Sequence, residues 1–178
     1  MLDRLIDLFL QFIDLFKFWE VVDEYEEAVV LRFGRWSRNL SPGVHWRIPF
    51  GIEKILMDTV TYATINMGPQ SLTTKDNKSI VVAAVIGFTT NDIKKLLLEV
   101  ESANNVLEDA SYGCITRYVL EHTWDELTSV EALEELTKQI RKKAFRYGIK
   151  VHDVSFSDQT ISRSHRLFTE GATRMGRL

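Results

Sequence analysis

The chain has 178 residues, 45% of them hydrophobic and 26% charged, and its formal net charge is −3. This composition argues against a chain disordered throughout and suits one domain with short appendages. The slightly acidic balance gives no reason to expect nucleic acid as a partner. The single cysteine, Cys114, excludes an intrachain disulfide and a cysteine cluster for zinc.

The first nineteen residues have the pattern of an amphipathic helix. Their polar residues would share one narrow stripe: Asp3, Arg4, Asp7, Gln11 and Asp14. Their large apolar residues would form the contact face: Leu5, Phe9, Phe12, Ile13, Phe16 and Trp19. An aspartate at the centre of a bilayer costs ~2.5 to 3.5 kcal/mol, against a gain of ~0.3 to 0.6 kcal/mol per Leu or Phe. We therefore predict that residues 1–19 lie on a membrane rather than cross it, or else pack against the protein itself or a second copy.

Residues 20–90 have the pattern of short strands separated by turns. The expected strands are residues 28–33, 44–48, 53–65 and 80–90, the last being the most buried. Turns or loops are expected at Gly34, at Pro42-Gly43, at Gly68-Pro69 and over residues 73–79. Pro49 should end the second strand, because proline cannot donate to a ladder. The short connections predict a compact, largely antiparallel sheet.

From residue 91 the pattern becomes helical. Asn91 or Asp92 can cap a short helix, and Ser102 can cap a longer one whose apolar face includes Cys114. Capping-box spacing occurs over residues 123–126 and again over residues 128–131. Gly148 should end the last helix before a strand over residues 149–156. The predicted class is α+β.

Several stretches together resemble the SPFH or band 7 domain of stomatins, prohibitins and flotillins. They are EYEEAVVLRFGR, SPGVHWRIPF, SLTTKDNKSIVVAAVIGFTTND and YGIKVHDVSF, with HTWDEL before the last helix. They occur in the family's order over about residues 22–158. The predicted organisation is a membrane-associating helix (1–19), an SPFH/band 7 domain (20–159) and a basic C-terminal tail (160–178).

The resemblance implies a membrane-peripheral domain that oligomerises, often into rings or cages, and that in several members restrains a membrane-bound protease. Family members typically have a stronger membrane anchor and continue into a long coiled coil, and this chain departs from both patterns. We predict a non-catalytic, membrane-associated homo-oligomeric scaffold, peripheral or monotopic on a cytoplasmic face. The alternatives are a regulatory adaptor that occludes a membrane-bound protease, and a soluble structural shell protein.

No pattern of residues indicates catalysis, a cofactor or a metal. The four histidines, His45, His122, His152 and His165, lie in separate predicted elements. The signatures of acyl transfer, nucleotide hydrolysis and dinucleotide binding are missing. We therefore expect no enzyme activity, no cofactor and no metal site.

Two further contact surfaces are predicted. Trp46, Ile48, Pro49 and Phe50 form either an apolar loop that dips into lipid headgroups or the end of a strand that fills the core. Arg32 and Arg35 could meet lipid phosphate, but exposed arginines beside a turn are more often solvated or paired with acids such as Glu24 and Glu26, so no site is assigned to them. A contact between subunits is predicted to pair Glu26 and Glu27 with Arg163 and Arg166 of the basic tail.

Overall fold

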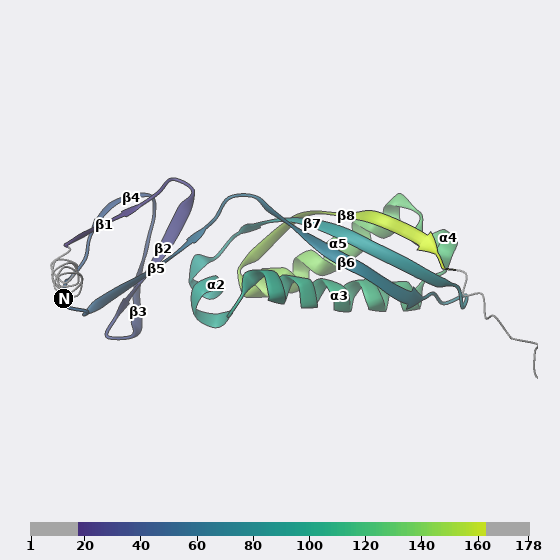
Figure 1. Cartoon of the computed structure of the whole chain (residues 1–178), viewed down its shortest axis with the longest axis horizontal. Helices are drawn as coiled ribbons and strands as arrows, with labels where there is room; N and C mark the ends of the chain where they lie inside the picture. The colour runs from purple at the N-terminus through teal and green to yellow at the C-terminus, as the bar shows by residue number, and fades with distance from the viewer. Residues whose placement is uncertain (1–17, 163–178) are drawn as a thin grey trace, which may run out of the picture.

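The computed structural model describes residues 18–162, which form two lobes along the long axis of the molecule (Figure 1). The smaller lobe is built from β1 (Trp19–Val22), β2 (Glu26–Arg32), β3 (Arg35–Leu40), β4 (Gly43–Trp46) and β5 (Glu53–Thr59). The larger lobe is built from β6 (Ala63–Thr73), β7 (Ser79–Thr90), α2 (Ile93–Glu99), α3 (Ala103–Glu121), α4 (Trp124–Leu127), α5 (Val130–Ala144), a 3-10 turn (Phe145–Tyr147) and β8 (Ile149–Ile161). The predicted amphipathic helix up to residue 17 and the tail from residue 163 lie outside the described residues.

Two small antiparallel sheets build the smaller lobe. In one, β2 lies between β3 and β5, and in the other β1 pairs with β4. Val22 of β1 packs with Ala28 and Val30 of β2 in a small core. Trp19, predicted as the last residue of a helix, instead begins β1, where it lies opposite Trp46. Aromatic and β-branched residues favour a strand, and the cross-strand pair with Trp46 stabilises it.

The larger lobe contains one antiparallel sheet, with the strand order β6-β7-β8. Side chains of β7 alternate, and the buried set points to the same core as α3 and α5: Ile80, Val82, Ala84, Ile86 and Phe88. The helices therefore cover one face of this sheet (Figure 1). The prediction that residues 80–90 form a deeply buried strand is confirmed.

The loop predicted at Gly68-Pro69 is wrong, because both residues lie inside β6. The pairing of β6 with β7 shifts between Met67 and Gln70, so the two residues occupy an irregularity in the ladder. β6 is an edge strand, where a proline without an N–H group leaves no ladder hydrogen bond unmade.

Most predicted helix ends are confirmed. Asp92 caps α2 by accepting a hydrogen bond from the Lys95 N–H at 3.2 Å. The Thr123 N–H donates to the Glu126 carboxylate at 2.7 Å, as in the predicted capping box. The cap of α5 is Ser129, one residue later than the predicted Thr128. The remaining predicted caps are also observed, with Ser102 at the start of α3 and a left-handed Gly148 after the last helical turn.

Several contacts join the lobes, among them a backbone hydrogen bond, a cation–π contact and apolar packing. The Val60 N–H donates to the Tyr25 carbonyl at 3.0 Å, and the Lys94 ammonium lies 3.8 Å from the centre of the Trp36 ring. Val29 of β2 packs in the core of the larger lobe. The predicted α+β class and the antiparallel pairing are confirmed, although the strands form three sheets rather than one compact sheet.

Candidate functional site

The β1–β4 ribbon exposes an apolar face in the smaller lobe, away from the larger lobe in Figure 1. Trp19 lies opposite Trp46, and Val21 lies opposite Val44. Alternation along each strand puts these four side chains on one face, while Val22 points to the core. Trp46 is 76% exposed and Val44 is 70% exposed. A face of two tryptophans and two valines is therefore in contact with solvent.

Two turns of the same lobe hold an exposed phenylalanine in left-handed backbone. Phe33 has φ 50° before Gly34 at 77°, and Phe50 has φ 63° before Gly51 at 71°. Turns with two successive positive φ angles favour Asn-Gly, because an aromatic residue in this conformation costs about 1 to 2 kcal/mol. The Phe33 side chain is 78% exposed, and neither phenylalanine belongs to a buried core. Burial in these cores therefore does not compensate the strain.

A buried carboxylate connects both turns. The Glu53 side chain is fully buried and accepts hydrogen bonds from Arg32 Nη2 at 2.8 Å and Nε at 3.1 Å. Its other oxygen accepts the Ile48 N–H at 2.9 Å, directly before the turn that contains Phe50. Arg38 adds a contact of 3.4 Å to Glu53 and donates to the Trp46 carbonyl at 2.9 Å. One side chain thus fixes the ends of β2 and β4 and the loop after β4.

The ionised form of Glu53 is the stable form. Burial alone would raise the pKa of this carboxyl group. The Ile48 N–H and the two arginines favour the carboxylate more strongly, so the pKa of Glu53 lies below its ordinary value. The network therefore keeps its negative charge under neutral and mildly acidic conditions.

The predicted lipid-contacting residues do not all lie at the surface. Trp19, Trp46, Ile48 and Phe50 are exposed. Pro49 is buried, so its ring faces the protein. The predicted residues Leu5, Phe9, Phe12, Ile13 and Phe16 lie outside the described residues.

The charged side chains also form pairs other than the expected ones. Arg32 pairs with Glu53 rather than with Glu24 or Glu26. Glu26 and Glu27 are neighbours in β2, so their side chains point to opposite faces of the sheet and cannot act as one patch. Their predicted partners Arg163 and Arg166 lie outside the described residues.

Sequence reasoning missed Val21 and Val44 of the exposed face, the exposed Phe33 and the buried Glu53. The sequence does carry a sign of the strained turn at Phe33, because Phe-Gly stands between two strands at the place where Asn-Gly is usual. Glu53 had no such sign, since its partners come from β2, β3 and the loop after β4.

The described part of the chain shows no site for metal chemistry. Between residues 18 and 162, no group of three His, Cys, Asp or Glu side chains is placed to hold a metal ion. None of the helices in that range combines the length and the apolar character that a bilayer crossing needs.

Comparison with known proteins identifies the family. The model of the SPFH domain / Band 7 family matches residues 20–166. The chain belongs to the SPFH/band 7 family. The resemblance inferred from the motifs is therefore confirmed.

Several SPFH/band 7 relatives are similar over most of this chain. HflK of Haemophilus influenzae is 28% identical over 141 residues, which cover 76% of this chain and 34% of HflK. A stomatin homologue of Pyrococcus horikoshii is 28% identical over 141 residues, covering 78% of this chain and 53% of the homologue. The protein unc-1 of Caenorhabditis elegans is 30% identical over 172 residues, which cover 86% of this chain and 56% of unc-1. The chain thus spans between about a third and just over half of the length of these relatives.

Proposed function

We propose that the protein is a non-catalytic scaffold that self-associates on a membrane, with the apolar end of its smaller lobe against the lipid. Membership of the SPFH/band 7 family, with relatives named as stomatins, supports this assignment. The segment predicted to be an amphipathic helix continues in sequence into β1, which carries part of the exposed β1–β4 face. This continuity in sequence supports one membrane-facing surface for both.

The observation that carries the proposal is the pair of strained phenylalanines. Phe33 and Phe50 occupy backbone positions at which asparagine would make the fold more stable. Both side chains are more than half exposed, so packing in the two buried cores does not account for an aromatic residue at either position. Entry into the headgroup and acyl boundary would supply it, at roughly 1.5 to 3 kcal/mol for each fully buried phenylalanine.

The decisive test substitutes both positions, Phe33→Asn together with Phe50→Asn. The double variant should be more stable to urea, by about 1 kcal/mol or more, because the positive φ angles suit asparagine. It should also float less with phosphatidylcholine vesicles, because two apolar contacts are lost. A pure folding defect would lower both quantities, so the opposite signs identify a lipid contact.

The matched control is Phe145→Asn. Phe145 is 54% exposed but lies in the larger lobe, with an ordinary φ of −59°. Its replacement should leave flotation unchanged. Flotation of the double variant equal to that of the wild type would refute the lipid role of the two turns.

The predicted first helix supplies the second part of the anchor. Phe9→Asp with Phe12→Asp should move the protein towards the soluble fraction. Self-association strengthens the attachment of every subunit, because anchors held in one plane bind as a multivalent unit. Light scattering in mild detergent tests this point, and a strict monomer at tens of micromolar would contradict it.

Two experiments distinguish the proposed function from the alternatives predicted from the sequence. A soluble shell protein would not float with vesicles. A protease-occluding adaptor would retain a membrane-bound protease in a pull-down from detergent-solubilised membranes.

A further inference from the structure

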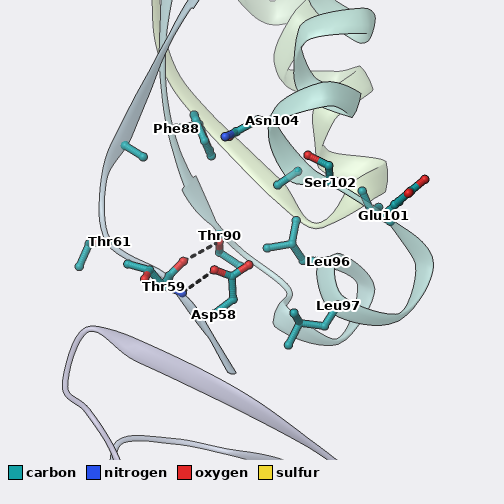
Figure 2. A pocket seen from close by; sticks show the side chains of 13 residues that line it. Asp58, Thr59, Thr61, Phe88, Thr90, Leu96, Leu97, Glu101, Ser102 and Asn104 are labelled. Carbon is teal, nitrogen blue, oxygen red and sulfur yellow. Dashed lines mark hydrogen bonds between the residues drawn. The ribbon is translucent and has the colours of Figure 1, made fainter. Parts of the chain in front are cut away.

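A pocket of about 440 Å³ lies where the two lobes meet. Figure 2 shows its two walls, with Asp58, Thr59 and Thr61 of the segment that links the lobes on one side and Leu96 and Leu97 of α2 on the other. Two hydrogen bonds hold the first wall. The Thr59 N–H donates to Asp58 at 2.8 Å, and the Thr90 hydroxyl donates to the Thr59 carbonyl at 3.4 Å.

The lining of the pocket combines apolar and acidic groups. Phe88 and Leu96 are buried and supply apolar surface, with the half-buried Leu97 beside them. Asp58 and Glu101 are exposed, and within residues 18–162 neither carboxylate forms an ion pair with a basic side chain. Such a lining suits a peptide segment in which arginines alternate with large apolar residues.

A second, independent observation indicates a missing positive charge. Glu27 of β2 lies directly opposite Asp58 of β5. Like charges directly opposite each other on neighbouring strands repel and destabilise the pair. Alternation puts Glu27 on the same face as Val29, whose side chain packs in the core of the larger lobe beside this pocket. The acidic rim therefore extends from the pocket onto β2, and a bound cation would relieve the repulsion.

We infer that residues 163–168 of a second copy of this chain occupy the pocket. This segment places Arg163 and Arg166 beside Leu167 and Phe168. Its arginines complement the acidic rim, and its apolar side chains suit the surface of Phe88, Leu96 and Leu97.

The distance that the segment after Ile161 can span decides whether the pocket is filled by the same copy or by a neighbouring copy. Ile161 pairs with Ile80 at one end of β7, whereas Thr90 lines the pocket at the other end. Ten strand residues separate these positions, a distance of about 33 Å. Phe168, the last residue of this stretch, lies only seven residues after Ile161 and reaches at most about 25 Å. The stretch of arginine and large apolar residues therefore falls short of its own pocket and reaches only that of a neighbour.

Disulfide cross-linking between two full-length copies tests this inference, which rests on the proposed self-association. One copy carries Glu101→Cys and the other, with a size tag, carries Arg166→Cys, both in a Cys114→Ser background. After co-expression and mild oxidation we expect a dimer band of mixed size. A control copy with Lys138→Cys, an exposed position on α5, should give several-fold less. Adding Glu27→Gln and Asp58→Asn to the first copy should lower the yield several-fold, because the acidic rim is lost.

The outcomes separate this inference from the proposed function. A yield no higher than that of the control, in a protein that light scattering shows to be oligomeric, overturns the inference and leaves self-association intact. A chain that carries both cysteines and cross-links only within itself overturns the assignment to a second copy. A monomer in light scattering overturns both proposals.

Discussion

Replacing Glu53 by glutamine should destabilise the smaller lobe and change the pH dependence of its stability. Glutamine keeps the shape of the side chain and one oxygen acceptor, but removes the negative charge that Arg32, Arg38 and the Ile48 N–H share. Breaking a buried ion pair costs about 3 to 5 kcal/mol. The two arginine side chains are 44% and 40% exposed, so water replaces part of what they lose. We expect a loss of about 2 to 3 kcal/mol in the free energy of unfolding at pH 7.

The pH dependence follows from the direction of the pKa shift. The pKa of Glu53 is lower in the folded protein than its ordinary value of 4.5. The folded state therefore gains stability from the carboxylate above pH 4.5, and this gain is lost as the pH falls through the folded pKa. The wild type should lose this contribution below about pH 4.5, whereas Glu53→Gln, which has no such carboxylate, should show a shallower decline.

Urea unfolding followed by tryptophan fluorescence measures both effects. Trp46 accepts a hydrogen bond from Arg38 through its carbonyl, so the emission of the smaller lobe reports on the network. Glu134→Gln is the matched control, because Glu134 is an exposed residue of α5. Equal stability of Glu53→Gln and wild type at pH 7, or identical slopes below pH 4.5, would refute this account of the network.

Two further predictions concern the larger lobe. In Gly87→Ala the added methyl group would overlap the Tyr62 hydroxyl, which crosses the sheet above Gly87, and we expect a loss of about 1 to 3 kcal/mol in urea unfolding. A Tyr62→Phe background should recover part of this loss, and no recovery would contradict the proposed overlap. Hydrogen bonds from Lys78 and Thr74 lower the pKa of Asp76 from 3.8 to about 2, so its stabilising effect is present above pH 3.8 and lost as the pH falls towards 2. Asp76→Asn should remove that part of the acid dependence, and an unchanged acid unfolding curve would contradict the assignment.

Local features of the fold were predictable from the sequence. The caps at Asp92 and Ser102 and the end of the helix at Gly148 depend on residues within one turn of the boundary. The buried strand β7 shows its two faces in its own alternation. Such elements need no partner to be recognised, because the deciding contacts lie within a few residues.

Features that depend on distant pairing were not predictable. Trp19 continues an apolar run that has helical spacing, but β4 pairs with it twenty-seven residues later and makes it a strand. Pro69 carries a turn signal, and only its place on an edge strand allows it inside β6. β8 extends to Ile161, beyond the predicted end at Phe156, because β7 offers a partner along its whole length.

The candidate surface shows the same division between local and distant information. The apolar character of Trp46, Ile48 and Phe50 is visible in the sequence, but exposure is not, and Pro49 between them is buried. Glu53 was missed because the groups that hold it come from three separate segments.

The buried carboxylate and the exposed phenylalanines are two parts of one physical arrangement. A turn with an aromatic residue in left-handed backbone is strained, and such strain persists only when the surrounding contacts fix the conformation. Glu53 does this for both turns, since Arg32 directly precedes Phe33 and the Ile48 N–H lies just before Phe50. The Phe33 N–H also donates to the Ile52 carbonyl at 2.9 Å, which ties the two turns to each other. Removing the charge of Glu53 should therefore release the presentation of both phenylalanines, and Glu53→Gln should bind vesicles more weakly even at temperatures where the larger lobe remains folded.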